Sequence, residues 1–367
     1  MKIGLFGHGT IGVGVDRIAS SIPGMEVRKI LSLVVDEEMK GREASSVDEI
    51  VCDPEIDTVV EVMGGVEPAF TFIKRAMEAG KNVVTANKAV VAAHYEDLAR
   101  IASEHGVAFR FTASVGGSIP WLVNLARATR VGSVEAIEGI MNGTTNFILN
   151  RMTNDGASFE SALKEAQELG YAERDPSADI DALDVRRKLL ISANVGFSVL
   201  LREEDLPTYG IRFVRPEDIA YAKDQNAVIK LVASASRTEG NGVSAFVMPS
   251  FVPADSLQAA VAANYNVISY TGSYSGTQSY IGEGAGRFPT AYNVVEDLMD
   301  IRDSFAVPYQ CEFPPCAPEN GNVMRRFYLR CGTRVTVTDR ISFDEARKAA
   351  DESLKNGQET FFAVLPE

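Results

Sequence analysis

The chain has 367 residues, 46% of them hydrophobic and 23% charged, which is the composition of a folded globular protein long enough for two domains. Its net charge of −14, from 36 basic and 50 acidic side chains, leaves no basic surface for a nucleic-acid backbone or an anionic membrane. The sequence shows no apolar run of transmembrane length, no signal-peptide pattern and too few cysteines for a disulfide framework, so we expect a cytoplasmic protein.

The first 130 residues alternate short apolar runs with helical patterns. Strands are predicted at 2–7, 26–35, 57–63, 82–86 and 107–115, and helices at 10–21, 70–79 and 95–106. Connections of this length join parallel strands, so this segment is predicted to be a doubly wound α/β domain of the Rossmann type.

A glycine motif follows the first predicted strand. Gly7, Gly9 and Gly12 have the spacing G-x-G-x-x-G and lie between a strand and a helix, which is the context that this motif needs. Glycines here let the backbone approach a pyrophosphate, which then lies at the N-terminus of the helix. The motif predicts a dinucleotide site, with a plain strand-to-helix turn as the alternative. We expect His8, inside the loop, to face solvent.

Asp36 stands at the end of the second predicted strand. A carboxylate at this place accepts hydrogen bonds from the adenosine ribose and favours NAD over NADP. The preference stays open, because Lys40 and Arg42 follow closely and could bind a 2′-phosphate, and because Asp36 could simply cap its loop.

From residue 131 the pattern changes to α+β. Strands are predicted at 134–141, 241–253 and 263–272, and helices at 158–170, 182–198 and 293–305. A proline-rich linker then precedes a short tail with the pattern strand, strand, helix, strand. The predicted domains are therefore 1–130, completed by 281–306, then 131–280, and a linker with a small α+β appendage at 307–367.

Charged residues that could carry chemistry lie mainly in the middle of the chain. Asp184 and Lys188 are four residues apart, so on a helix they share a face and can form an ion pair. The structural alternative is a solvated helix start, where acidic residues are favoured. Lys88 follows a predicted strand at the carboxyl edge of the sheet, where open α/β sheets bind ligands, although a surface lysine is the simpler interpretation.

Six segments in chain order are GHGTIGVGV, VVTANK, SVGGSIP, EGIMNGTTNFIL, EAQELGYAERDPSADIDALDVRRKL and GEGAGRFPTA. Together they resemble the homoserine dehydrogenase family over about residues 1–305. The family interconverts L-homoserine and L-aspartate 4-semialdehyde by hydride transfer with NADPH or NADH. The resemblance thus implies a Rossmann domain and an α+β domain for substrate binding and dimerisation.

The resemblance also implies roles for single residues. Lys88 and Lys188 would flank the reacting carbonyl, Lys188 as the proton donor, and Asp184 would orient Lys188 and the substrate. Further substrate contacts are implied at Glu173, Asp179, Gly143 and Thr144. These residue types suit the reaction, because a forming alkoxide needs a positive donor and the ammonium group of the substrate needs carboxylates.

Cofactor contacts are implied at Gly7, Gly9, Thr10, Ile11, Gly12, Asp36, Gly64, Lys88 and Gly286. A sodium ion is implied at the backbone carbonyls of Thr112, Val115, Gly117 and Ile119. The chain departs from the family pattern at three positions, because Thr112 replaces a glutamate and Ser118 and Ala182 replace glycines. A Cβ at a glycine position can shift a loop.

The tail resembles part of a regulatory ACT domain, whose first strand is similar to MRRFYLR. About 45 residues are too few for that module, so we expect an incomplete version and infer no threonine feedback. The resemblance implies a homodimer that acts in threonine and methionine biosynthesis. Two alternatives are a related dehydrogenase for another amino or hydroxy acid and a cofactor-binding regulator without turnover, against which the two lysines and Asp184 argue.

Overall fold

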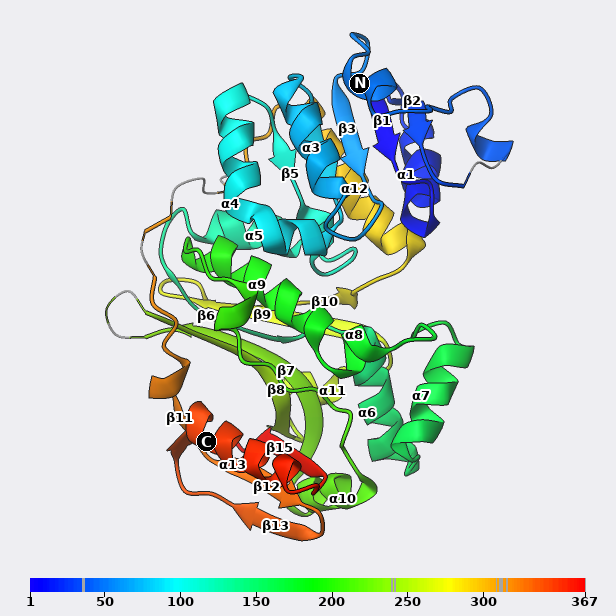
Figure 1. Ribbon diagram of the computed structural model, residues 1–367. Coiled ribbons are helices and arrows are strands. Elements are labelled where there is room, and N and C mark those ends of the chain that lie inside the picture. The colour runs from blue at the N-terminus through cyan, green and yellow to red at the C-terminus, as the bar shows by residue number, and fades with distance from the viewer. Residues whose placement is uncertain are drawn as a thin grey trace. The chain divides into compact units, whose positions relative to one another are not determined.

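The computed structural model describes residues 1–34, 37–238, 240, 242–307, 309, 313–314 and 316–366 (Figure 1). The chain forms two compact units. Unit 1 comprises residues 1–132, 194–200 and 282–314, and unit 2 comprises residues 133–193, 201–281 and 315–367. Among the helices in the described ranges, none has the length and apolar character needed to cross a membrane.

Unit 1 contains a five-stranded parallel sheet in the order β2-β1-β3-β4-β5. Its strands are β1 Lys2–Phe6, β2 Glu26–Leu31, β3 Thr58–Glu61, β4 Asn82–Thr85 and β5 Phe109–Arg110. Its helices are α1 Thr10–Ser20, α2 Asp48–Val51, α3 Ala69–Glu78, α4 Lys88–His105, α5 Trp121–Ala128 and α12 Arg287–Arg302. The predicted parallel α/β domain is confirmed.

A short segment beside β2 completes the strand order. Ile30 forms a parallel bridge with Glu43, and its backbone bonds to Arg42 and Ala44. With this segment counted as a strand, the order becomes 3-2-1-4-5-6, which is the order of dinucleotide-binding folds. The succession of strands reverses between β1 and β3, and sheets of this kind bind ligands beyond the carboxyl ends of the strands at that point.

Helices cover both faces of the sheet in unit 1 (Figure 1). On one face, α1 and α12 enclose a core that includes Leu5, Val15 and Leu298. On the other face, α3 and α4 pack together, and Phe6 meets Phe72 edge to face with ring centroids 5.5 Å apart. The apolar residues of β1 therefore alternate between two helical layers, as the doubly wound pattern requires.

The strand predicted at 107–115 is shorter in the structure and covers only Phe109–Arg110. The chain turns at Thr112–Ser114 into a 3₁₀ turn. Two hydrogen bonds explain this turn, because the backbone N–H and the hydroxyl of Thr112 both donate to the buried carboxylate of Asp297, at 2.9 and 2.7 Å. That partner lies 185 residues away, so the local pattern gives no sign of the turn.

Unit 2 is built on an eight-stranded mixed sheet in the order β10-β9-β6-β7-β8-β15-β12-β13. Its strands are β6 Val134–Ile140, β7 Ala227–Arg237, β8 Val243–Pro253, β9 Tyr265–Gly272, β10 Gly276–Glu283, β12 Phe327–Cys331, β13 Arg334–Val337 and β15 Thr360–Val364. Its helices are α6 Gly143–Asp155, α7 Phe159–Glu168, α8 Ser177–Ile180, α9 Leu183–Phe197, α10 Pro216–Asp224, α11 Leu257–Ala260 and α13 Phe343–Lys355. The long antiparallel hairpin of β7 and β8 lies at its centre.

The C-terminal tail has the predicted strand, strand, helix, strand pattern and extends the sheet of unit 2 (Figure 1). Residue Val364 of β15 pairs in parallel with Ser250 of β8. Helix α13 packs Phe343 into a core shared with β8, β12 and β15. A buried ion pair between Asp218 of α10 and Arg330 of β12, 2.8 Å apart, also ties the tail to this unit.

Candidate active site

The glycine loop between β1 and α1 has the geometry of a nucleotide-binding turn. Gly7 has a φ of +96°, and a Cβ there would lie 3.0 Å from the carbonyl oxygen of Val62. A Cβ at Gly12 would lie 2.2 Å from the carbonyl oxygen of Gly7, whereas the space around Gly9 is open. The first and third glycines thus permit tight packing, and the second leaves room for a ligand to approach the backbone.

Helix α1 begins at this loop without a side-chain cap. Its first N–H groups therefore remain available to an anion, and the positive end of the helix dipole points the same way. Gly9 and Thr10 are exposed and Ile11 is half-buried. The exposed Gly64, with a φ of +84°, follows β3 on the other side of the reversal in strand order. These residues fit the pyrophosphate of a dinucleotide.

The side chain of His8 is buried, so the expectation that it faces solvent is wrong. Its Nε2 lies 3.3 Å from Oδ2 of Asp16, and both carboxylate oxygens of Asp16 accept hydrogen bonds from Arg42, at 2.7 and 2.8 Å. Burial alone would raise the pKa of Asp16, but the bonds from Arg42 and His8 outweigh it and hold this pKa below its usual value. The guanidinium of Arg42 is thereby turned toward α1. Asp36 lies outside the described residues.

Lys88 is the first residue of α4, directly after β4, as the sequence predicts. The side chain of Asn87 caps this helix and also donates to Glu61 and to the carbonyl oxygen of Gly65. Glu61 is fully buried, and its burial raises its pKa even though Thr85 donates a 2.6 Å hydrogen bond to it. This buried network fixes the start of α4, and hence Lys88, at the carboxyl edge of the sheet.

Lys188 and Asp184 form a buried ion pair on α9. Nζ of Lys188 lies 2.8 Å from Oδ2 of Asp184, and both side chains are 8% exposed. The same Nζ donates a 2.7 Å hydrogen bond to the carbonyl oxygen of Met141 at the end of β6. An ammonium group has three N–H donors, so one donor of Lys188 remains without a partner among the described residues.

Asn142, for which the sequence predicts no role, forms hydrogen bonds with acidic residues of unit 2. Its amide nitrogen donates to Oδ1 of Asp179 at 2.7 Å and to Oδ2 of Asp184 at 2.9 Å. Its oxygen caps α6 by accepting from the backbone of Thr145. Asp184 pairs with Lys188, whereas Asp179 is bonded to Asn142, so with Lys188 protonated this cluster has one negative charge in excess, which suits a cationic amino group on a ligand.

The start of α6 carries the other predicted substrate residues. A Cβ at Gly143 would lie 2.5 Å from the carbonyl oxygen of Asn264, and the hydroxyl of Thr144 donates to the carbonyl oxygen of Tyr171. The side chain of Glu173 is exposed. The structure thus brings Asp179, Asp184 and Lys188 together through Asn142 and leaves Glu173 at the surface. The chain between β6 and α6 belongs to the same polar cluster.

A buried lysine of β7 forms hydrogen bonds with α6. Nζ of Lys230, on β7, donates to Asn146 and Asn150 of α6 and to the carbonyl oxygen of Val261, at 2.7, 3.2 and 2.9 Å. Burial without a charged partner lowers the pKa of Lys230 to about 8. Asn146 also donates to the carbonyl oxygens of residues 261, 263 and 265, so this network holds the loop that packs on Gly143.

Family models match most of the chain. One described as "Homoserine dehydrogenase, NAD binding domain" matches residues 17–112, and one described as "Homoserine dehydrogenase" matches residues 120–299. A homoserine dehydrogenase of Synechocystis sp. is 40% identical over 316 residues, which cover 82% of this chain and 73% of that relative. The chain belongs to the homoserine dehydrogenase family. It is an NAD(P)-dependent oxidoreductase, as the resemblance implies.

Other homoserine dehydrogenases agree with this assignment. The enzyme of Bacillus subtilis is 36% identical, with 82% of this chain and 72% of the relative covered. A crystal structure from Thiobacillus denitrificans has a TM-score of 0.90 at 29% identity and covers 100% of this chain and 98% of that chain. A hyperthermophilic archaeal homoserine dehydrogenase in complex with NADPH has a TM-score of 0.72 at 26% identity, with coverages of 83% and 98%.

The departures from the pattern of this family have different structural consequences. Ala182 is fully buried with a φ of +64°, a backbone conformation that costs energy for any residue with a Cβ. Ser118 does not share this strain, because its φ is not positive. Thr112 turns its side chain to Asp297.

The loop for which the resemblance implies a sodium ion fits such an ion poorly. The carbonyl oxygens of Gly117 and Ile119 both accept hydrogen bonds from the amide nitrogen of Asn293 on α12, at 2.5 and 2.9 Å. Two of the four carbonyls implied for sodium are therefore already bound by protein. The beginning of the same helix is formed by Gly286, with a φ of +131°.

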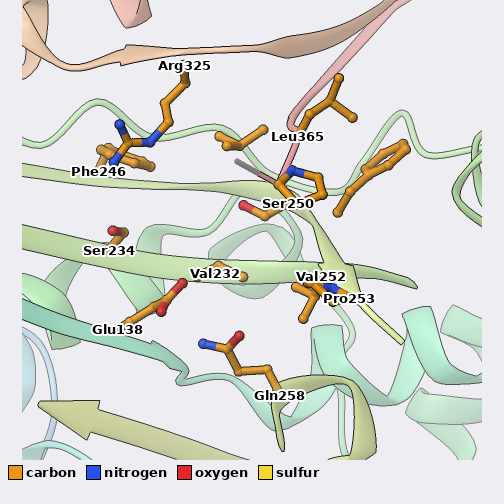
Figure 2. A pocket seen from close by; sticks show the side chains of 13 residues that line it. Glu138, Val232, Ser234, Phe246, Ser250, Val252, Pro253, Gln258, Arg325 and Leu365 are labelled. Atoms are coloured by element: carbon orange, nitrogen blue, oxygen red, sulfur yellow. The ribbon is translucent and has the colours of Figure 1, made fainter. Parts of the chain in front are cut away.

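A hollow of about 240 Å³ lies on the sheet of unit 2, away from the polar cluster around Lys188 (Figure 2). Figure 2 shows Glu138, Ser234 and Gln258 on one side and Arg325 on the other. None of the predicted homoserine dehydrogenase residues lines it. Within the described part of the chain, no three His, Cys, Asp or Glu residues group in a way that could hold a metal ion.

Proposed function

We propose that Lys188 donates the proton to the oxygen of the substrate when L-aspartate 4-semialdehyde is reduced to L-homoserine, and accepts it in the reverse reaction. The observation that carries this role is the buried ammonium, held by Asp184 and the carbonyl of Met141, with no partner for its third N–H among the residues that the structure describes. Both anchors aim the group while leaving one proton for a ligand. A proton donor near an oxygen that becomes an alkoxide lowers the barrier of the hydride transfer.

We propose that Asp179 and Asp184 bind the ammonium group of the amino-acid substrate. Asn142 holds both carboxylates at one amide, so their charges stay close to Lys188. Glu173, Gly143 and Thr144 are proposed contacts for the rest of the substrate, because the loop at the start of α6 borders this cluster. A carboxylate pair selects an amino acid over a simple hydroxy acid, which argues against the hydroxy acids among the alternative substrates.

Lys88 is proposed as the second lysine of the reaction. It begins α4, so its backbone N–H also lies at the positive end of a helix dipole. The buried Glu61 and Asn87 keep this helix start in place. A second positive group supports the negative charge that develops on the carbonyl oxygen.

The nucleotide is proposed to bind with its pyrophosphate on the glycine loop and the N-terminus of α1. The nicotinamide supplies or accepts the hydride when bound. Gly7, Gly9, Thr10, Ile11, Gly12, Gly64 and Gly286 are the proposed contacts, together with Asp36 and Lys88. We propose NAD as the preferred nucleotide, because Asp16 holds both terminal nitrogens of Arg42 and turns this cation away from a 2′-phosphate.

The chain is further proposed to act as a homodimer in threonine and methionine biosynthesis, with residues 131–280 as the substrate and dimerisation domain. Support comes from the hairpin of β9 and β10 at the edge of the sheet, where Tyr265, Tyr274 and Ile281 are exposed. An exposed edge strand with apolar side chains is a surface on which a second copy can pair. Light scattering of the purified protein gives its mass directly. The cytoplasmic location stays a prediction.

The roles of the lysines are tested with Lys188→Met and Lys88→Met, assayed in both directions with homoserine and with aspartate 4-semialdehyde. We expect kcat to fall at least about 10²-fold in each, with the dissociation constant of NADH changed little by Lys188→Met. Lys29→Met, at a half-buried lysine of β2 outside the proposed site, is the control for the loss of a lysine. A Lys188→Met enzyme that retains most of its kcat would contradict the proposed proton transfer.

A further inference from the structure

The amide of Asn293 is bonded to two of the four carbonyl oxygens that the family resemblance implies for a cation in the loop of residues 112–119. Its nitrogen carries two N–H groups, which suffice to donate to the carbonyl oxygens of Gly117 and Ile119 together. The side chain is 1% exposed, so water does not compete for these bonds. This buried donor therefore belongs to the folded structure of unit 1, where it lies on α12.

The distances show what the amide replaces. Calcium, whose ionic radius is close to that of sodium, has its oxygen ligands about 2.3–2.6 Å away. The nitrogen of Asn293 lies 2.5 and 2.9 Å from its two oxygens, so the shorter distance falls within this range and the longer one exceeds it by about 0.3 Å. A sodium ion shared by the same carbonyls would face the positively polarised hydrogens of this amide.

Other protein contacts also hold the loop. The backbone N–H of Ser118 donates to the carbonyl oxygen of Glu283 at 3.3 Å. A Cβ at Gly117 would lie 2.5 Å from that same oxygen, so the two segments are in close contact. At the other end of the loop, Thr112 is bound to Asp297 of α12 through its N–H and its hydroxyl. Protein contacts thus hold the loop at residue 112 and at residues 117–119.

We propose that Asn293 is a built-in substitute for a monovalent cation, so that this chain needs neither sodium nor potassium to hold the loop of residues 112–119. The loop lies beside residues 283–286, where the helix that carries the proposed nicotinamide contact Gly286 begins. Its order therefore affects nucleotide binding in the proposed enzyme. The effect of cations on the melting temperature does not depend on turnover, so this measurement remains decisive even if the proposed reaction fails.

The sharpest variant is Asn293→Asp, which changes one NH₂ group to an oxygen of similar size. A carboxylate would then face two carbonyl oxygens, and this repulsion is relieved by a cation. Asn293→Ser is the second variant, because it removes the amide with its two N–H donors and its smaller hydroxyl leaves room for an ion. Asn124→Asp is the matched control, since Asn124 of α5 donates to the carbonyl of Pro120 at a more exposed site in the same unit.

The melting temperature is measured at pH 8.5 in NaCl, KCl and choline chloride of equal ionic strength. For the wild type and Asn124→Asp we expect the same values in all three salts. In at least one of the variants Asn293→Asp and Asn293→Ser, we expect the melting temperature to be at least about 3 °C higher in NaCl or KCl than in choline chloride. This rise should saturate with salt concentration. Homoserine oxidation by the wild type should likewise be unchanged, within twofold, when choline replaces sodium.

Two results would overturn the proposal. The first is a saturable, cation-specific rise in the melting temperature of the wild type, which would mean that an ion binds beside the amide. The second is the absence of any cation-specific rise in both variants at position 293, which would mean that the loop has no place for a cation once the amide is lost.

Discussion

Replacing Asp184 by asparagine probes the charge that stabilises the ammonium of Lys188. The change keeps the size of the side chain and removes its negative charge. Lys188 then remains buried with the carbonyl of Met141 as its main partner. Loss of one member of a buried ion pair costs about 3–5 kcal/mol if the other member stays charged. Lys188 can avoid this cost by losing its proton.

The size of the effect follows from this cost. A difference of about 3 kcal/mol between the protonation states of Lys188 corresponds to about two pH units, at about 1.4 kcal/mol for each unit. In Asp184→Asn the neutral amine of Lys188 should therefore become more favourable relative to the ammonium. Homoserine oxidation needs the neutral amine as proton acceptor, so the acidic limb of its pH profile should move about two units lower. The alkaline limb of the reduction, which needs the ammonium, should move in the same direction.

The assay is the pH profile of kcat/KM in both directions, followed by NADH absorbance. The control is Asp181→Asn, which removes a carboxylate three residues from Asp184. Asp181 pairs with Arg212 at the surface, where both side chains are more than one third exposed. An exposed pair of this kind contributes at most about 1 kcal/mol, so the control should leave both limbs in place. Folded Asp184→Asn protein with unshifted limbs would refute the reasoning.

Three further predictions concern stability. Ala182→Gly should raise the free energy of unfolding by about 1 kcal/mol in urea, because it relieves the positive φ of a buried alanine, and a loss of stability would contradict this account. Above pH 8 Lys230 is neutral in the native protein but still protonated in the unfolded chain, so the unfolded chain binds more protons. From pH 8 to 10 the free energy of unfolding of the wild type should therefore rise by about 2 kcal/mol relative to that of Lys230→Met. A difference that does not change with pH would argue against the lowered pKa. Arg330→Met leaves the carboxylate of Asp218 buried and unpaired and should cost about 3–5 kcal/mol, whereas a cost below about 1 kcal/mol would show that the ion pair does not anchor the tail.

The sequence predicts the elements whose signals are local. Strands β1, β3 and β4 are short apolar runs, and the glycine loop follows the first of them at the required spacing. The ion pair of Asp184 and Lys188 was likewise predictable, because four residues on a helix bring two side chains to one face. Local periodicity therefore predicts most of the helices and strands of unit 1.

The parts that the sequence did not predict depend on distant partners. Asn142 reaches Asp179 and Asp184, 37 and 42 residues away, and Asn293 reaches carbonyls about 175 residues away. An asparagine has no periodic signature, so its spacing gives no warning of such contacts. The one sequence signal for Asn142 is that it directly precedes Gly143, for which the resemblance implies a substrate contact.

Two errors have similar causes. His8 was expected at the surface because a polar residue in a loop is usually exposed, but Asp16 and Arg42 enclose it. The sequence pattern does not predict strand β7, because Lys230 interrupts its apolar run. The asparagines of α6 and the carbonyl oxygen of Val261 make that lysine acceptable inside the protein. In both cases a buried polar residue finds its partners through tertiary structure alone.

The most direct measurement is the oxidation of L-homoserine by the purified protein, followed at 340 nm with NAD⁺ and with NADP⁺, for the wild type and for Lys188→Met. The account predicts nucleotide reduction that depends on homoserine, faster with NAD⁺ than with NADP⁺, and a loss of at least about 10²-fold in the variant. Folded wild-type protein that reduces neither nucleotide in the presence of homoserine would contradict the central claim.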